Sequence, residues 1–238
     1  MNAMSRRGFL AGCTTVAAGL AARELPAASP PTEAGLSSEG LLAGHPGFQQ
    51  RSVMPLGHAE LPGFLSREQL AAHHAEYVHD VERLKDAEQQ LRDASLDAAR
   101  YGALRRAQTA AANGVLLHEL YFGTLAPAKV EMPRYVARHL EEHMGGLERW
   151  VADFRRCALD AKAWALLVYD PYDDRWHNAI LDGDDVGIWL GANPLVVCDV
   201  AEHAFGSDYR SREEYVGKFI DRIDWNEVAT RYRAVDRM

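Results

Sequence analysis

Residues 194–205 place a buried strand directly before a group of metal-binding residue types. The apolar, β-branched run of residues 195–198 predicts the strand. Asp199 ends it and His203 follows four residues later, so a carboxylate oxygen and an imidazole nitrogen converge if the chain turns helical there. These two ligand types suit a first-row transition metal. The same spacing also fits an Asp that caps a helix start, beside a His without a ligand role.

This stretch also carries a family resemblance. Asp199-Val-Ala-Glu-His-Ala-Phe205 is similar to the Asp-x-Trp-Glu-His-Ala-Tyr signature of the iron/manganese superoxide dismutases. Residues 219–232 resemble the closing helix of that family and its Asn-Trp-x-x-Val-x-x-Arg-Tyr ending, with Asp224 in place of the usual Asn. The resemblance covers about residues 60–235, which is nearly all of the chain beyond its N-terminal segment.

The first residues are typical of an export signal. A twin-arginine motif, Met4-Ser-Arg-Arg-Gly-Phe-Leu10, precedes an apolar run of small residues that ends near Ala22. That run is shorter than the roughly 20 residues that a membrane span needs. We therefore interpret residues 1–28 as a twin-arginine signal peptide, cleaved after Ala28 or alternatively after Ala22, and expect a periplasmic or otherwise exported protein.

Composition limits the partners that the protein can have. The 238 residues are 47% hydrophobic and 25% charged, which allows a substantial core, and the formal charge is −8. This acidic balance argues against nucleic acid and against an anionic membrane surface. Removal of the signal leaves Cys157 and Cys198, which we expect to be buried free thiols because Cys198 lies inside a strand pattern.

The middle of the chain predicts an α-helical hairpin after an extended arm. Residues 29–60 are rich in Pro, Ser and Gly without a period, which indicates a linker or wrapping arm. A helix is expected from the N-cap Ser66 to about Leu91, and a second from Asp97 to Leu125. Prolines 127 and 133 suggest a boundary, so we expect a hairpin domain at 61–127 and a second domain at 128–238.

The second domain is predicted to be mixed. Residues 134–161 are helical in pattern with a break at Gly145-Gly146. Three strands are expected at 163–170, 177–181 and 195–199, joined by short turns that favour antiparallel pairing. The predicted fold class is α+β, with a long N-terminal helical hairpin and a three-stranded antiparallel sheet flanked by helices. The same element order is found in the dismutase family.

The resemblance implies one iron or manganese ion per chain, held by four side chains. Those implied ligands are His73, His118, Asp199 and His203. His118 follows from Asn113-Gly-Val-Leu-Leu-His-Glu-Leu-Tyr-Phe122, which is similar to the family's Asn-His-x-x-Phe/Tyr-Trp. A helix His that faces solvent is the alternative for His118.

The ligand of the first helix has two alternatives. Aligned from Leu65-Ser, the chain places His73 at the ligand position, whereas aligned from Tyr77-Val it places Gln69 there, because about four residues of the family pattern are missing. Four residues shift a helix face by only about 40°, so either His face can still point inward. We take His73 as the ligand, since a site with three other ligands is more plausibly completed than left open.

Three further roles follow only from the resemblance. His177 is the candidate for the residue that hydrogen-bonds the solvent molecule on the metal, with a surface His as its alternative. Tyr77 is the candidate gate of the substrate funnel. Glu202 implies a homodimer, because in the family this Glu bonds across a two-fold interface. Two replacements, Ala201 for Trp and Gly206 for Tyr, remove aromatic side chains that the family has near this site.

The function implied is an exported superoxide dismutase that converts superoxide to oxygen and hydrogen peroxide. An alternative is a metal-binding or structural protein of the same fold with weak or no activity, favoured by the replaced residues. A di-iron helical bundle would need two Glu-x-x-His motifs. Only Glu76-Tyr-Val-His79 lies on a long predicted helix as that bundle requires, and Asp199 on a strand does not belong in it.

Overall fold

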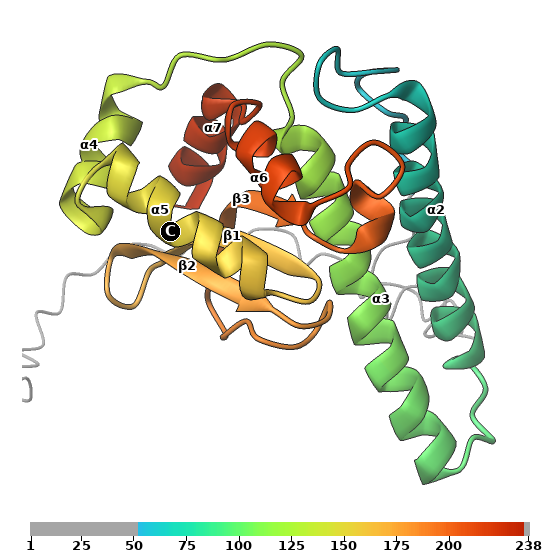
Figure 1. The fold of residues 1–238 in the computed structure, drawn as a ribbon. Coiled ribbons are helices and arrows are strands. Elements are labelled where there is room, and N and C mark those ends of the chain that lie inside the picture. Colours follow the sequence, from blue (N-terminus) through green and yellow to red (C-terminus); the bar gives the residue numbers. More distant parts are fainter. Residues whose placement is uncertain (1–51, 236–238) are drawn as a thin grey trace, which may run out of the picture.

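The computed structural model describes residues 52–235, and the predicted signal peptide and most of the predicted arm lie outside them. Helices α2 (Arg67–Gln90) and α3 (Ala98–Thr124) form the predicted antiparallel hairpin (Figure 1). Helix α2 begins at the expected cap, Ser66, which accepts a hydrogen bond from the amide of Gln69. Asp97, predicted as the first residue of the second helix, is the N-cap of α3 and accepts a hydrogen bond from the amide of Arg100. The free end of the hairpin projects beyond the rest of the molecule.

The next two helices are separated at the predicted break. Helix α4 (Arg134–Met144) ends at Gly145 with φ 75°, and helix α5 (Leu147–Asp160) starts after Gly146 with φ 98°. Both angles lie in the left-handed region, where glycine has no Cβ to clash with the backbone. The two glycines therefore reverse the chain between amphipathic helices that can each turn an apolar face to the core.

The sheet has three antiparallel strands in the order β2-β1-β3. Strands β1 (Trp164–Asp170), β2 (Arg175–Leu181) and β3 (Asn193–Asp199) match the predicted positions. The central strand β1 is buried along almost its whole length, as its apolar run requires. Its register places Trp164 opposite Leu181 on β2 and opposite Asp199 on β3, so the last residue of β3 lies at the start of β1.

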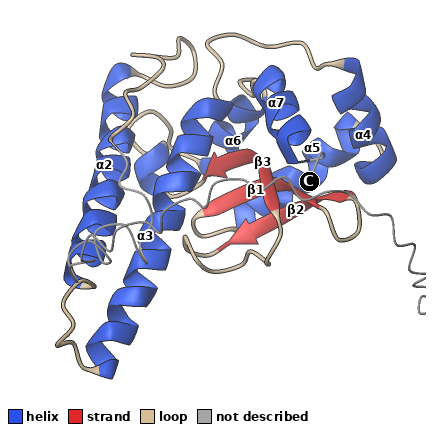
Figure 2. Ribbon diagram, turned by 180° about the vertical axis from the view of Figure 1, so that it is seen from behind, coloured by secondary structure: helices blue, strands red, loops and turns tan. Residues whose placement is uncertain are grey.

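Helices pack against the sheet and follow its last strand in sequence. The 3₁₀ turn η1 (Glu202–Ala204) follows β3, and α6 (Arg212–Ile220) and α7 (Trp225–Val235) come last. Helices α4 and α5 contact β2, while α3 and α7 contact β3. Figure 2 shows the hairpin on one side of the sheet and α4 and α5 on the other. The α+β fold class is thereby confirmed.

One apolar core joins the hairpin to the sheet. Leu117 and Tyr121 of α3 belong to the same buried cluster as the strands, so the core crosses the expected boundary near residue 127. The division at that boundary stays a prediction. Cys198 is buried and Cys157 half-buried, and both are free thiols, close to the expectation. Among the described helices, none is both long and apolar enough to cross a membrane.

Candidate metal centre

Four side chains from four elements meet where β3 ends beside the hairpin. They are His73 on α2, His118 on α3, Asp199 at the end of β3 and His203 in η1. One ligand atom from each lies within 4.8 Å of the others. The structure therefore brings together all four residues that the resemblance implied as ligands.

The three imidazoles converge on a single carboxylate oxygen. The Nε2 atoms of His73, His203 and His118 lie 2.9, 3.0 and 3.9 Å from Asp199 Oδ2. The Asp199 and His73 side chains are fully buried and that of His118 is 4% exposed, whereas that of His203 is 38% exposed. The other carboxylate oxygen of Asp199 accepts the amide of Ala201 at 2.9 Å, which fixes the carboxylate plane.

The hydrogen bonds of His118 leave one nitrogen without a partner. Its Nδ1 lies 2.8 Å from the carbonyl oxygen of Gly114, and because a carbonyl only accepts, Nδ1 carries the proton. In the neutral ring Nε2 is then a lone-pair nitrogen, and it is buried with no hydrogen-bond partner. A buried lone pair beside a carboxylate is costly unless a cation binds it, and the three-His, one-Asp set suits iron or manganese. The residues fit such an ion.

The charges of these residues are coupled. Burial alone raises the pKa of Asp199, but hydrogen bonds from His203 and His73 outweigh it and hold that pKa below its ordinary value. Burial lowers the pKa of His73 despite the neighbouring carboxylate. Burial also opposes protonation of His203, yet its hydrogen bond with Asp199 raises its pKa. An ionised Asp199 and a neutral His73 are the forms that bind metal.

Aromatic rings pack around the buried part of the cluster. The ring centroids of Tyr121 and Phe122 lie 4.6 and 5.1 Å from that of His73. Trp164 meets His118 edge-on at 5.0 Å. These contacts hold the imidazole planes and exclude water from one side of the cluster.

The first-helix alternative is decided by position along α2. His73 lies in the cluster, whereas Gln69, one turn earlier, turns its amide to the segment after β3. The Gln69 amide donates to the carbonyl oxygen of His203 at 2.7 Å and accepts the amide of Ser207 at 2.8 Å. Of the two, the structure places His73 at the ligand position.

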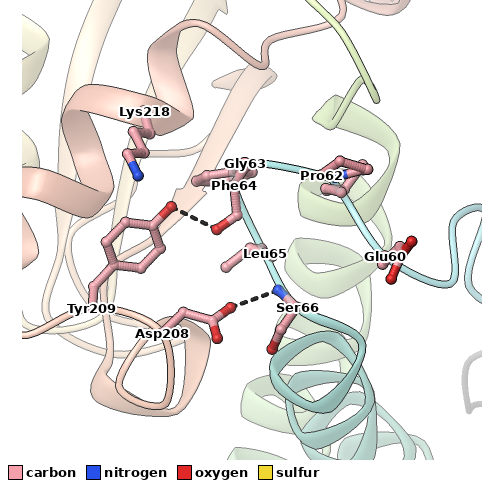
Figure 3. A pocket seen from close by; sticks show the side chains of 10 residues that line it. Glu60, Pro62, Gly63, Phe64, Leu65, Ser66, Asp208, Tyr209 and Lys218 are labelled. Atoms are coloured by element: carbon pink, nitrogen blue, oxygen red, sulfur yellow. Dashed lines mark hydrogen bonds between the residues drawn. The ribbon is translucent and has the colours of Figure 1, made fainter.

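The start of α2 is fastened to the same segment by two more bonds, which Figure 3 shows. The amide of Ser66 donates to Asp208 Oδ2 at 2.6 Å, and the hydroxyl of Tyr209 donates to the carbonyl oxygen of Phe64 at 2.5 Å. Burial raises the pKa of Tyr209 to about 12, so the hydroxyl stays protonated and donates across the physiological range. The helix that carries His73 and the turn that carries His203 are thus directly connected.

A small cavity of about 150 Å³ lies beside the cluster. His118, Asp199 and His203 line it together with four residues that were not predicted to lie at this metal site: Glu76, Asp80, Arg83 and Asp184. Asp80 Oδ2 lies 3.3 Å from His118 Nδ1, and Asp184 accepts the Trp164 indole N–H at 2.9 Å. Asp80 is seven residues after His73 on α2, a spacing that places both on one helix face and was the available signal.

His177 does not reach the cluster. On β2 it pairs with Val168, four residues along β1 from Trp164, the residue opposite Asp199. Four strand residues span about 13 Å, which is too far for a hydrogen bond to anything on the metal. Its Nε2 instead contacts Asp173 at 2.8 Å. The structure therefore does not support the predicted solvent-bonding role and favours the surface alternative.

Tyr77 and Glu202 lie near the centre without joining it. Tyr77 is buried and its ring centroid is 6.3 Å from that of His118, but its hydroxyl donates to Glu119 at 3.0 Å and is not among the groups that line the cavity. The geometry therefore gives no support to a gate role. Glu202 is exposed on η1, beside His203.

Two other groups of potential metal ligands occur among residues 52–235, and both are less suitable. In the group of His139, Glu142 and His143, the Nδ1 of His143 accepts the amide of Trp176, so Nε2 of the neutral ring carries a proton instead of a lone pair. In the group of Asp170, Asp173 and His177, both carboxylates already accept hydrogen bonds within the β1–β2 hairpin.

Known proteins resemble this chain over most of its length. The profile of the family described as "Iron/manganese superoxide dismutases, C-terminal domain" matches residues 133–231. Superoxide dismutase 2 (Mn) of Haloferax volcanii is 33% identical over 162 residues, which are 67% of this chain and 81% of that protein. Superoxide dismutase (Fe) of Aquifex aeolicus is 32% identical over 179 residues, covering 71% and 84%. Superoxide dismutase 1 (Mn) of Halobacterium salinarum is 31% identical over 185 residues, covering 75% and 92%. The chain therefore belongs to the iron/manganese superoxide dismutase family.

Proposed function

We propose that this protein is an iron- or manganese-dependent superoxide dismutase that holds one ion per chain through His73, His118, Asp199 and His203. The observation that carries the proposal is the convergence of three imidazole Nε2 atoms on one buried carboxylate oxygen. The three-His, one-Asp set accepts either metal, and the names of the relatives include both.

The reaction disproportionates two superoxide anions and two protons into oxygen and hydrogen peroxide. A bound redox metal supplies the electron relay by alternating between its 3+ and 2+ states. Asp199 adds a fixed negative charge that stabilises the more positive state, and the hydrogen bonds of His118 to Gly114 and of Asp199 to Ala201 keep the ligands oriented. The cavity lined by Arg83 offers a route for a small anion, since Arg83 is its one cationic lining residue apart from the imidazoles.

The proposal includes a homodimer. His203 and Glu202 form an exposed patch on η1, although His203 is a ligand in the proposed site. A second copy seated on this patch would exclude water from His203 and give the Glu202 carboxylate a partner. Analytical ultracentrifugation of the wild-type protein and of Glu202→Ala tests this: the proposal expects a dimer that weakens in the variant. A wild-type monomer would contradict it.

The proposal also includes export by the twin-arginine route, supported by Arg6 and Arg7 ahead of the apolar run. Replacing both arginines with lysine is expected to retain the precursor in the cytoplasm, as cell fractionation would show. Continued export of the double variant would refute this part.

A second candidate function is a metal-binding protein of the same fold with weak dismutase activity. The observation that favours it is the acidic cavity, where Asp80, Asp184 and Glu76 lie close to the cluster. These carboxylates line the cavity that leads to the cluster, so their negative charges repel an incoming superoxide anion. If this candidate holds, the metal is bound stoichiometrically, but superoxide consumption is slow and rises in Asp184→Asn.

The deciding experiment is elemental analysis of the mature protein, with His73→Ala and His74→Ala side by side. His74 is the matched control, because it is adjacent on α2 but its Nε2 contacts the carbonyl oxygen of Met54 instead of the cluster. We expect about one iron or manganese per chain in wild type and His74→Ala, and loss in His73→Ala. Superoxide consumption then separates the two candidate functions. A wild type without either metal would refute both.

A further inference from the structure

Gln69 is a buried polar residue of α2 that the proposed metal site does not use as a ligand. Its side chain is only 1% exposed, and both of its amide atoms are engaged. Nε2 donates to the carbonyl oxygen of His203 at 2.7 Å, and Oε1 accepts the amide of Ser207 at 2.8 Å. A buried amide with two good bonds to one short segment fixes that segment relative to the helix.

The segment that Gln69 holds has little structure of its own. His203 lies in a 3₁₀ turn of three residues, and its side chain is 38% exposed. Its imidazole has one side-chain partner in the cluster within hydrogen-bonding distance, Asp199, at 3.0 Å. Short 3₁₀ turns are weakly stable, so the position of this backbone depends on external contacts.

Helix geometry explains why Gln69 reaches this segment. Residues four apart in an α-helix lie on the same face, so Gln69 and His73 project in the same direction from α2. His73 meets Asp199 from that face at 2.9 Å, and Gln69 meets the backbone of His203 one turn earlier. One face of α2 thus sets both the position of the His73 imidazole and the position of the backbone that carries the His203 imidazole.

Two neighbouring bonds hold the far end of the same segment. Asp208 accepts a hydrogen bond from the amide of Ser66, and Tyr209 donates one to the carbonyl oxygen of Phe64 (Figure 3). Ser66 and Phe64 lie just before Gln69 in sequence. These bonds anchor residues 208–209, whereas Gln69 hydrogen-bonds the backbone of His203 itself.

We propose that Gln69 is a positioning residue of the metal centre, which holds the His203 backbone so that its imidazole faces Asp199 and the bound ion. This inference rests on the proposed metal site. Loss of an outer hydrogen bond of this kind typically weakens metal binding by about 10- to 100-fold. We expect that range for variants of Gln69.

The test compares Gln69→Leu, Gln69→Glu and Gln108→Leu with the wild-type mature protein loaded with manganese. Gln69→Glu keeps an acceptor for Ser207 but loses the donor to His203, and its similar size preserves packing if Gln69→Leu fails to fold. Gln108 is the matched control, a Gln on α3 that is 4% exposed and accepts a hydrogen bond from Arg105, away from the metal cluster. The readouts are the rate of manganese release into excess EDTA and the optical spectrum of the oxidised metal, which reports the ligand geometry.

We expect release to be at least 10-fold faster and the spectrum altered in both Gln69 variants, with both readouts unchanged in Gln108→Leu. Release within threefold of wild type, with an unchanged spectrum, in Gln69→Glu would overturn the inference. Equal acceleration in Gln108→Leu would also overturn it, by showing a general effect on stability. A wild type that retains no manganese would instead refute the proposed function.

Discussion

Arg231 connects the two elements that carry His118 and Asp199, so its replacement should destabilise the whole molecule. Its guanidinium is mostly buried on α7 and donates to Thr124 Oγ1 at 2.9 Å, to the carbonyl oxygen of Leu195 at 3.1 Å and to that of Leu120 at 2.8 Å. Burial lowers its pKa, although the nearby Glu227 carboxylate opposes this. The first and third acceptors belong to α3, and the second belongs to β3.

The expected cost of Arg231→Met follows from the acceptors that it leaves behind. Each buried acceptor without a donor costs about 1–3 kcal/mol. The carbonyl oxygen of Leu120 also accepts a hydrogen bond from the Thr124 hydroxyl, so its loss of the arginine donor costs less. Methionine also removes the desolvation penalty of the buried guanidinium charge, which offsets part of the destabilisation. Glu227 is 40% exposed and adds less than about 1 kcal/mol. We therefore expect a net loss of about 3 kcal/mol, or roughly 6–12 °C in Tm for a chain of this size.

Urea unfolding of the metal-free protein, followed by circular dichroism, measures this loss without a contribution from metal binding. Arg233→Met is the control, because Arg233 is on the same helix but exposed, and should cost less than about 1 kcal/mol. Arg231→Lys should fall between the two, since one ammonium cannot reach all three acceptors. A cost below about 1 kcal/mol for Arg231→Met would refute the reasoning.

Three further predictions concern the cavity and the core. A Cβ added at Gly114 would overlap the Asp80 carboxylate and lie 3.2 Å from Asp184 Oδ2, so Gly114→Ala should cost about 1–3 kcal/mol in urea unfolding, whereas no loss would show that these side chains move freely. Burial raises the pKa of Asp184 above its ordinary value, so the folded state binds the Asp184 proton more tightly than the unfolded state does. The protonated Asp184 side chain therefore contributes to the stability of the fold at low pH, and this contribution is lost as the pH rises through the folded pKa. The metal-free Asp184→Asn variant should therefore gain stability relative to wild type between pH 4 and pH 7, and a Tm difference that stays constant or falls would contradict this. The hydroxyls of Tyr121 and Tyr215 are buried and 3.0 Å apart, so each Phe substitution should cost about 1–2 kcal/mol and the double variant less than the sum, while additive costs would mean that the hydroxyls do not interact.

Local features of the sequence determined the secondary structure and most of the metal cluster. Caps at Ser66 and Asp97, the Gly145-Gly146 break and the apolar strand runs act between residues that are adjacent in the chain, so they can be recognised without a fold. The Asp199–His203 spacing and the surroundings of His118 likewise lie within single motifs. Together with the family resemblance, they were sufficient to predict the hairpin, the antiparallel sheet and the four residues that converge.

Only the tertiary structure decided which side chains meet across different elements. The choice between His73 and Gln69 depends on where the end of β3 lies along α2, because the two residues share one helix face and are one turn apart. The position of His177 depends on the register between β1 and β2, which places it opposite Val168 and far from Asp199. Asp80 and Asp184 join the cavity from a helix and a loop that are distant in sequence. Such contacts depend on packing angles and strand register, which arise from the whole core and not from any single segment.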